Sequence, residues 1–410
     1  MLKAGSLLYA IYICLLLAIM TSGLLYVFFM NKSLSDRYEM QDRLIERCNS
    51  CLELYLANRN QFQDKGKQEW QLFDDGIQCD FELKRWGMYA KLVGKTYFKN
   101  DTVSRTMLIG EKIHDKQLAL YLGDFGEELK ISGTTRIVGN LKLPKKGYET
   151  VNILGNQKVN NPTVQGAVTA SGQELPKLVL PQTRQESTKV VSAEDMERGK
   201  RHFNSFKNPT IEVLVPRGGS LEGLAIKGNY RINALDTLYI DSAVALEDVI
   251  VKAPKVIIEK EFIGSMQVFA DKEVVVEEDV ILQYPSCVVI RSGSSGSEME
   301  KKITLGENAK IYGGLVMDAI GFKAKQENTM IIAENALIVG DIYCNGILEF
   351  KGEVVGTIYA HKLQLKTNFS LYSDVLLNAK IDGTRLPKEF VRLPLFQKPQ
   401  NNEFGIIKDL

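Results

Sequence analysis

Residues 339–343 read Val-Gly-Asp-Ile-Tyr, and the pattern returns sixteen residues later as Val-Gly-Thr-Ile-Tyr at 355–359. In the same alignment, Ile347 matches Leu363. A period this short fits one coil of a solenoid and is too short for a propeller blade. The repeat therefore predicts stacked coils of β-strands.

The repeat also occurs further upstream. Leu-Tyr-Ile at 238–240 aligns with Val-Ile-Ile at 256–258 and with Val-Val-Val at 274–276, in steps of eighteen residues. A coil of this length cannot bury its inward side chains alone, whereas a stacked neighbour covers them and pairs the backbone N–H groups. Every second side chain is then expected to point inward, as for Val274, Val276, Val280 and Leu282.

Longer spacings indicate insertions at the corners of the coils. The segments 303–309 and 330–336 keep the same side-chain order, so an insertion is expected near Phe322–Asn328, and Ser292–Ser297 reads as a flexible loop. Over residues 210–385 we therefore expect a right-handed parallel β-helix. Residues 386–410 are expected to form a C-terminal tail.

Two regions before the repeat are less regular. A short β region is expected at 128–170, because residues such as 137–141 (Ile-Val-Gly-Asn-Leu) alternate in the same way. Residues 171–209 are polar and contain several prolines, which predicts a linker. Ser192 resembles a helix N-cap with acidic residues after it, which predicts a helix from about 193 to 205 that links two β regions or caps the coils.

The repeat region resembles the bactofilins, small β-helical proteins that polymerise end to end. The resemblance rests on the two Val-Gly-x-Ile-Tyr copies and on the alternation of Val and Ile, and it covers only the C-terminal repeat region. It implies self-association through the ends of the coils. Bactofilins lack the large N-terminal portion that this chain has.

The N-terminal region predicts a membrane anchor. From Ala4 to Asn31 there is no charged side chain, and Ser6–Met30 is long enough to cross a hydrocarbon core of about 30 Å as one helix. An amphipathic pattern comes next, and neither proline nor glycine lies between Leu24 and Asn60. Residues 1–60 are therefore expected to form one helix of about 50 residues, half in lipid and half packed on the next folded region of the chain. The charges that flank the span are too few to predict its orientation in the membrane. The short tail before it favours a single span of the inner membrane with the bulk of the chain in the periplasm.

This helix resembles the first helix of type IV pilins and type II secretion pseudopilins. The matching residues are the short leader Met1-Leu2-Lys3-Ala4-Gly5 and the helix that begins at Ser6, which implies prepilin-type processing between Gly5 and Ser6. A typical pilin has an acidic residue near position five of the mature helix, and this chain has Ala10, or Tyr9 in the other register. Some minor, tip-located members of that family also lack the acid.

A small α+β platform is expected at 61–127. Cys79–Leu83, Met88–Val93 and Ser104–Ile109 read as strands, because they are rich in β-branched and aromatic residues. We expect a small antiparallel sheet that packs on the amphipathic half of the long helix.

Charge and cysteine content exclude some classes of protein. The 51 basic and 50 acidic side chains give a net charge of +1, which argues against a nucleic-acid-binding surface. Six cysteines in 410 residues are too sparse for a disulfide framework. Cys48 and Cys51 form a CxxC that is compatible with a zinc site, a redox dithiol or, the favoured reading, two cysteines on a helix face. Buried apolar positions in strands are expected for Cys79, Cys287 and Cys344.

Parallel β-helices also carry polysaccharide lyases and hydrolases, whose catalysis uses acidic side chains. The candidate carboxylates fall into two groups, Asp236, Asp241 and Asp248, and Glu277, Glu278 and Asp279. Solvated outward positions are the favoured interpretation of both groups. The histidines, His114, His202 and His361, show no ligand or triad spacing.

These features together predict a non-enzymatic, membrane-anchored structural or assembly protein of the cell envelope. Its coils would serve self-association or docking to a larger machine, and its partners would be the membrane, other proteins or further copies of itself. Polysaccharide is a further candidate partner, and no cofactor or metal is expected. The alternative is a surface carbohydrate-processing lyase or hydrolase.

Overall fold

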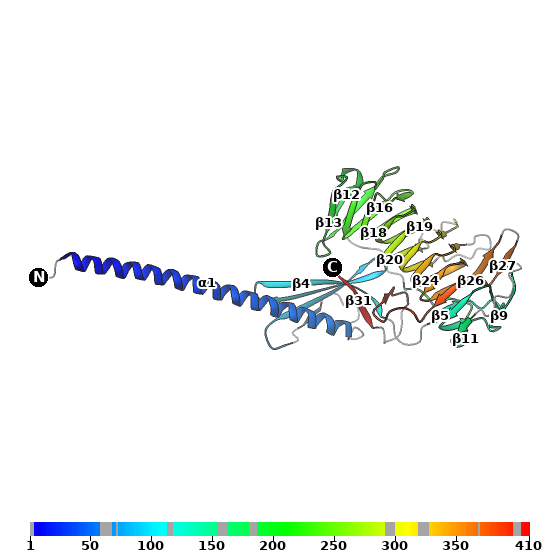
Figure 1. Cartoon of the computed structure of the whole chain (residues 1–410), viewed down its shortest axis with the longest axis horizontal. Coiled ribbons are helices and arrows are strands. Elements are labelled where there is room, and N and C mark those ends of the chain that lie inside the picture. The colour runs from blue at the N-terminus through cyan, green and yellow to red at the C-terminus, as the bar shows by residue number, and fades with distance from the viewer. Residues whose placement is uncertain are drawn as a thin grey trace. The chain divides into compact units, whose positions relative to one another are not determined.

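The computed structural model describes residues 4–57, 68–70, 73–112, 118–153, 163–179, 187–291, 300–318, 328–367, 370–396 and 403–410 (Figure 1). The protein is mainly β, with one long N-terminal helix. It divides into two compact units. The first unit holds residues 1–83 and 92–105, and the second holds residues 84–91 and 106–410.

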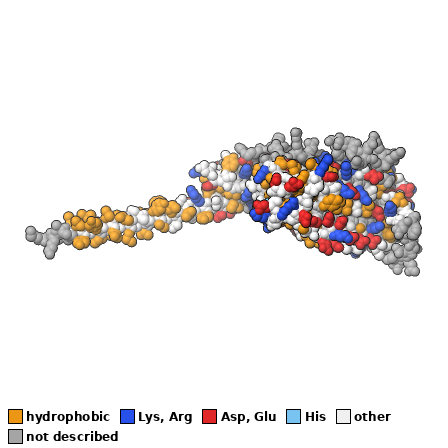
Figure 2. Space-filling view, turned by 90° about the horizontal axis from the view of Figure 1, so that it is seen from above, with side chains coloured by type: hydrophobic (Ala, Val, Ile, Leu, Met, Phe, Trp, Pro, Cys, Tyr) orange, Lys and Arg blue, Asp and Glu red, His pale blue; other side chains and the backbone are white. Residues whose placement is uncertain are grey.

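The N-terminal helix is continuous. α1 (Ala4–Ala57) runs for 54 residues, which confirms the prediction of a single long helix. From Leu24 to Ala57 it contains no proline or glycine that would interrupt its backbone hydrogen bonds. Hydrophobic side chains cover the face of its first half seen in Figure 2, and the first Lys and Arg side chains appear beyond them.

An antiparallel sheet follows α1, as predicted. Its first four strands are β1 (Gln68–Trp70), β2 (Gln78–Trp86), β3 (Tyr89–Phe98) and β4 (Asp101–Lys112). Two strands from the end of the chain, β30 (Val391–Arg392) and β31 (Phe404–Asp409), pair antiparallel with β4. Residues 113–390 are therefore inserted between neighbouring strands of one sheet.

The insertion is dominated by parallel strands. In chain order they are β5 (Leu118–Leu122), β6 (Leu129–Ser132), β7 (Arg136–Val138), β8 (Asn140–Leu143), β9 (Tyr148–Thr150), β10 (Thr163–Gln165), β11 (Val168–Ala170), β12 (Ser187–Ser192), β13 (Arg201–Asn204), β14 (Thr210–Val215), β15 (Ala225–Gly228), β16 (Tyr230–Ala234), β17 (Leu238–Ile240), β18 (Ala245–Ile258), β19 (Ile263–Val276), β20 (Ile281–Arg291), β21 (Lys302–Leu305), β22 (Lys310–Asp318), β23 (Thr329–Ile332), β24 (Leu337–Phe350), β25 (Glu353–Val355), β26 (Ile358–Lys366), β28 (Val375–Leu377) and β29 (Lys380–Asp382). β27 (Leu371–Ser373) forms an antiparallel hairpin with β26.

β18 shows how one group of consecutive strands, called a coil below, pairs in parallel with the next group. Its residues 245–247 pair with β15, residues 250–252 with β16 and residues 256–258 with β17, all in parallel. β19 then pairs with β18 in the same way, including residues 274–276 on residues 256–258. The eighteen-residue matches predicted from the sequence are confirmed.

Two further predicted matches have different outcomes. Residues 303–305 pair with residues 330–332, as predicted. The match of Ile347 with Leu363 is wrong, because the pairing of β24 with β26 shifts register between Cys344 and Ile347, so that Leu363 lies opposite Leu348. The insertions predicted at Ser292–Ser297 and Phe322–Asn328 lie outside the described residues, apart from Asn328.

The inward side chains form one continuous core. Val274, Val276, Val280 and Leu282 have no exposed surface, as predicted. Equivalent side chains of the other coils belong to the same buried cluster, from Leu120 and Ile137 to Leu376 and Ile381. A single apolar interior therefore stabilises all of the coils together.

The coils are not stacked in chain order. β5 pairs with β26, β6 with β28, and β7 with β29, so the first coil lies against the last one. β8, β10 and β11 continue the pairing beyond that coil, whereas β12 pairs with β14 and β13 with β15. The short β region (residues 128–170) therefore stacks on the end of the repeat formed by its last strands, β26 to β29.

The recurrent Val-Gly pair has a steric cause. Gly313, Gly340 and Gly356 have φ between 137° and 147°, and they lie in successive coils. A Cβ at Gly340 would lie 1.6 Å from the carbonyl oxygen of Gly313, and one at Gly356 would lie 1.9 Å from that of Gly340. In the same way, a Cβ at Gly166 would lie 2.0 Å from the carbonyl oxygen of Gly139. Only glycine fits this corner of the coil.

The predicted helix at 193–205 is wrong. Ser192 does act as an N-cap, since its hydroxyl accepts the N–H of Glu194, but only one 3-10 turn (Ala193–Asp195) follows. Gly199 has a φ of 74°, and β13 then pairs with β15. The segment lacks an apolar helical face, and strand pairing outweighs the capping signal.

We expect Gly340→Ala to lower the stability of the second unit by about 3 kcal/mol or more, because the new Cβ adds a backbone clash to the strain of a positive φ. Gly147→Ala is the matched control, since Gly147 has a φ of 75° but no atom within 4 Å of the added Cβ. It should cost only about 1 kcal/mol. Urea unfolding of both variants measures the difference, and equal losses would contradict the steric account.

Candidate functional site

The second half of α1 has a buried face within the first unit. Leu44, Cys48, Cys51, Leu52 and Tyr55 are all buried, at helical spacings of three and four residues. This is the later part of the stripe that the amphipathic pattern predicted, and the antiparallel sheet covers it. Leu34, Tyr38 and Ile45, which the pattern also placed in the stripe, are exposed.

Close contacts hold the helix against this sheet. The Tyr55 and Phe81 rings lie 5.8 Å apart. A Cβ at Gly94 would lie 2.8 Å from Leu52 Cδ2, so glycine at this position lets the helix approach β3. The Thr96 hydroxyl donates a hydrogen bond of 2.9 Å to the carbonyl oxygen of Leu44.

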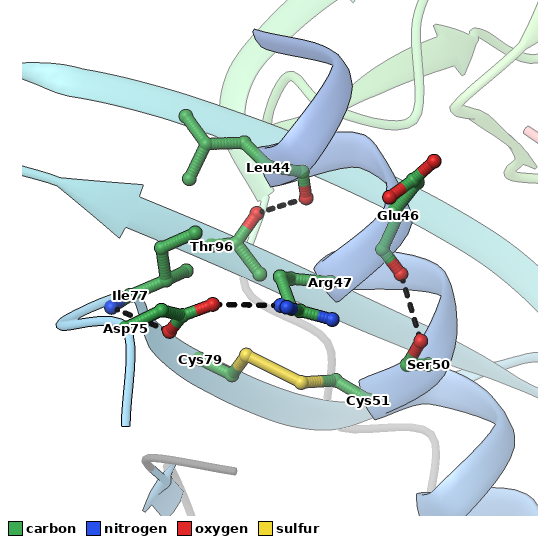
Figure 3. The surroundings of a disulfide bond; sticks show 9 residues. All are labelled: Leu44, Glu46, Arg47, Ser50, Cys51, Asp75, Ile77, Cys79 and Thr96. Carbon is green, nitrogen blue, oxygen red and sulfur yellow. Dashed lines mark hydrogen bonds and ion pairs between the residues drawn. A yellow bond between two sulfur atoms is a disulfide. The ribbon is translucent and has the colours of Figure 1, made fainter. Parts of the chain in front are cut away.

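A disulfide bond joins α1 to the sheet (Figure 3). Cys51 of the helix is bonded to Cys79 of β2, 28 residues further along the chain. Cys51 lies on a helix face and Cys79 is buried in a strand, as predicted, but the disulfide between them was not predicted. Cys48, three residues earlier, is the other member of the CxxC pair; it is buried and is not part of this disulfide. Closing a loop of this length stabilises the fold by about 3–4 kcal/mol on the chain-entropy estimate.

An ion pair lies beside the disulfide. Arg47 Nε donates to Asp75 Oδ2 at 2.8 Å, and Ile77 N–H donates to Asp75 Oδ1 at 3.1 Å. Desolvation alone would raise the pKa of Asp75, but the hydrogen bonds from Arg47 and Ile77 outweigh it and lower that pKa below its ordinary value. The Arg47 guanidinium also lies 3.8 Å from the centroid of the Phe73 ring. These contacts fix the helix just before the disulfide.

The first half of α1 shows the opposite pattern. Its large apolar side chains from Leu7 to Met30 are exposed, and the most apolar window of the helix has a mean hydropathy of 2.4. Thr21 and Ser22 donate their hydroxyls to the carbonyl oxygens of Leu17 and Ala18 at 2.9 and 2.7 Å. These hydroxyls are therefore satisfied without water, as a lipid environment requires. α1 is the one described helix long and apolar enough to cross a membrane.

Gly5 and Ser6, the predicted processing residues, lie in the first turn of α1. They remain a prediction from the pilin resemblance.

One outer face of the parallel sheet is covered by the chain itself. The rings of Tyr343, Tyr359 and Tyr121 lie in successive coils with centroids 6.3 Å apart. Tyr343 donates its hydroxyl to the carbonyl oxygen of Pro176 at 3.1 Å, and Tyr121 does so to Glu174 at 3.1 Å. Burial raises the pKa of Tyr343 and of Tyr359. This tyrosine row acts as a packing surface.

A buried ion pair lies on the same face. Arg392 Nη1 lies 2.9 Å from Asp341 Oδ1 and 2.9 Å from Thr357 Oγ1. The Asp341 carboxylate also accepts the N–H of Thr357 at 3.1 Å. Because Asp341 and Thr357 follow Gly340 and Gly356, the repeat itself creates the site that receives Arg392.

The first group of candidate carboxylates does not converge. Asp236 and Asp241 lie in the turns before and after β17, and Asp248 lies between two paired segments of β18. Asp241 accepts the N–H of Ala243 at 2.9 Å, and Asp248 pairs with Lys408. Their positions at three turns of one coil give no shared site.

The second group shares one turn. Glu278 pairs with Lys260 at 2.8 Å, and Glu277 accepts the backbone N–H of Lys260 at 3.2 Å. Asp279 adopts a φ of 58° in the turn. The three residues therefore connect neighbouring coils.

The remaining candidates show structural contacts. The His361 ring packs against Phe125 with centroids 4.6 Å apart, and His202 Nε2 lies 2.9 Å from the carbonyl oxygen of Glu197. His114 lies outside the described residues. Burial raises the pKa of the Cys287 and Cys344 thiols, which disfavours their thiolates. Within the described part of the chain, no group of three or more His, Cys, Asp and Glu residues is placed to hold a metal ion.

No protein-family model matches the sequence, and no curated protein matches it. Among solved structures, the crystal structure of the competence-associated pilin ComZ from Thermus thermophilus is similar, with 12% identity over 88% of this chain and 96% of that chain. Its TM-score of 0.21 is too low for the match to carry an argument.

We expect the double substitution Cys51→Ser and Cys79→Ser to destabilise the first unit by about 3–4 kcal/mol, because the unfolded chain loses its cross-link. Cys48→Ala is the control, since it removes a buried sulfur from the same helix face without breaking the disulfide. Urea unfolding of the full chain, followed by limited proteolysis with the cleavage sites mapped within residues 1–105, measures the loss of stability of this unit. Non-reducing peptide mapping should recover Cys51 linked to Cys79, and a link from Cys48 to Cys79 would contradict the structure.

Proposed function

We propose that the protein is a non-enzymatic, single-span component of a cell-envelope assembly, with a pilin-like anchor. One observation carries the proposal: a single unbroken helix has an exposed apolar first half and a second half that is disulfide-bonded to an antiparallel sheet. If its first half lies in the membrane, the helix anchors the folded sheet that is bonded to its second half. The resemblance to pilins implies such a helix, with an apolar half followed by an amphipathic half.

The inserted parallel strands form a right-handed β-helix in this proposal. The parallel pairing of each coil with the next, the repeated glycine corner and the continuous apolar core support it. Such a solenoid offers a large rigid surface for docking. β9 and β11 at one end of the pairing order have exposed side chains throughout, which makes that end the candidate for contact with a partner or a second copy.

The disulfide supports an extracytoplasmic location for the domain. Disulfides persist in oxidising compartments and are rare in the cytosol. Cys51 and Cys79 both follow the apolar span, so the part of the chain after the span would lie in the periplasm and the span in the inner membrane. Cleavage before Ser6 would then occur on the cytoplasmic side.

Membrane fractionation of the full chain in a bacterial host tests this function. The protein should resist carbonate extraction, and added protease should digest the domain in spheroplasts but not in intact cells. Leu16→Glu with Ile19→Glu should release the protein from the membrane, because each charge near the centre of a span costs about 2.5–3.5 kcal/mol. Leu34→Glu, at an exposed position of α1 beyond the apolar stretch, is the control and should not release it.

Mass spectrometry of the mature N-terminus tests the pilin-like part separately. In a host with a prepilin peptidase, the chain should begin at Ser6. An intact Met1 on membrane-integrated protein would overturn the pilin-like processing and leave the anchor in place. Carbonate extraction of the wild-type chain would overturn the anchor itself.

A further inference from the structure

A pocket of about 480 Å³ lies within the first unit, between α1 and the turn that joins β3 to β4. The helix contributes Phe29, Lys32, Asp36 and Arg37, and the turn contributes Lys99 and Asp101. This volume lies in the range of small-molecule sites, roughly 300–1,000 Å³. The pocket was not evident from the sequence, because the turn lies more than sixty residues after the helix positions.

The pocket lies where the apolar stretch of α1 ends. Phe29 belongs to the last uncharged turn of the helix, and Lys32 is the first charged residue after it. From Phe29 to Arg37 the helix rises about 12 Å, which exceeds the headgroup layer of one leaflet, roughly 5–8 Å thick. With the apolar stretch in lipid, the Phe29 and Lys32 side of the pocket is at headgroup depth, and the long side chain of Arg37 can reach back towards it, because helical side chains point towards the N-terminus.

The charges in the pocket are of both signs. Lys32, Arg37 and Lys99 are exposed cations, and Asp36 and Asp101 are exposed carboxylates. Within the described part of the chain, none of these five side chains forms an ion pair or a side-chain hydrogen bond. A ligand with a separate anionic and cationic group would match them, since phosphate binds Lys and Arg and ammonium binds carboxylates.

Lys99 occupies an unusual backbone position. It has a φ of 52° in a two-residue hairpin turn, where Asn, Asp or Gly is the usual residue. Its ammonium lies 5.1 Å from the centroid of the Phe98 ring, which also lines the pocket. The turn therefore presents a cation and an aromatic ring together, the combination found at membrane interfaces.

We propose that this pocket binds the headgroup of phosphatidylethanolamine. Its phosphate lies against Lys32, Arg37 and Lys99, and its ammonium lies against the two carboxylates. Phe29 and Phe98 contact the first carbons of the acyl chains. The inference rests on the proposed membrane anchor and adds a lipid preference to it.

Lipid retention by the full-length protein tests the proposal. The protein is reconstituted in nanodiscs of equal parts phosphatidylethanolamine, phosphatidylcholine and phosphatidylglycerol, then delipidated in mild detergent, and retained lipid is measured by mass spectrometry. Wild type should retain phosphatidylethanolamine preferentially. Arg37→Ala with Lys99→Ala should reduce that retention about tenfold, because charge-assisted hydrogen bonds to the phosphate are lost.

A second variant tests the cationic half of the headgroup. Asp36→Asn with Asp101→Asn should shift the preference towards phosphatidylglycerol, because the repulsion of an anionic lipid falls and the ammonium loses its partners. Lys95→Ala is the control, since Lys95 is an exposed lysine of β3, four residues before Lys99, that does not line the pocket. It should retain lipid as wild type does, and the Cys51–Cys79 link in each variant reports that the unit has folded.

Two outcomes would overturn the inference while leaving the anchor intact. One is a wild-type protein that resists carbonate extraction yet retains the three lipids equally. The other is equal retention of phosphatidylethanolamine by wild type and by the Arg37 and Lys99 variant. A wild-type protein that carbonate extracts would instead overturn the proposed function.

Discussion

The parallel strands depend on stacking, because no single coil can bury its own inward side chains. The first coil, with β5, β6 and β7, obtains its neighbour from the last, with β26, β28 and β29. Arg136 N–H donates to the carbonyl oxygen of Ala379 at 2.9 Å, and Gly383 N–H donates to that of Val138 at 2.8 Å. This contact joins the two ends of the inserted region, so its apolar core is completed only after residue 382 has been placed. The strands β4 and β30, which flank the insertion, can then pair in one antiparallel sheet.

The sequence predicts features that arise from local repetition. The glycine corners and the alternation of Val and Ile indicated parallel coils, because each coil must satisfy the same steric conditions. The absence of proline and glycine after Leu24 indicated a continuous helix. The pairing of the first coil with the last could not be predicted, since coils with the same inward pattern are interchangeable as neighbours. The helix expected at 193–205 failed because the capping signal at Ser192 says nothing about the strand partner that the next residues find in β15.

At the candidate site, too, the sequence predicts local features but not the contacts between distant segments. Burial of the helix stripe at Leu44, Cys48 and Leu52 follows from the amphipathic pattern. The disulfide could not be predicted in this way. The CxxC spacing suggested that Cys48 and Cys51 act as a pair, whereas Cys51 is bonded to Cys79 of β2. The spacing of Cys51 and Cys79 carries no local signal, and only the packing of helix on sheet brings them together. The disulfide and the Arg47–Asp75 ion pair then couple an exposed apolar span to a folded domain.

Cysteine cross-linking across the junction of the first and last coils tests the account most directly. Arg136 and Lys380 are exposed and lie opposite each other in neighbouring parallel strands, about 4.8 Å apart. Arg136→Cys with Lys380→Cys should be joined rapidly by mild oxidation or a short bismaleimide. Arg136→Cys with Leu337→Cys, three strands and roughly 14 Å apart, should not be joined. Equal cross-linking of the two pairs, or none in the first, would contradict the stacking of the first coil on the last.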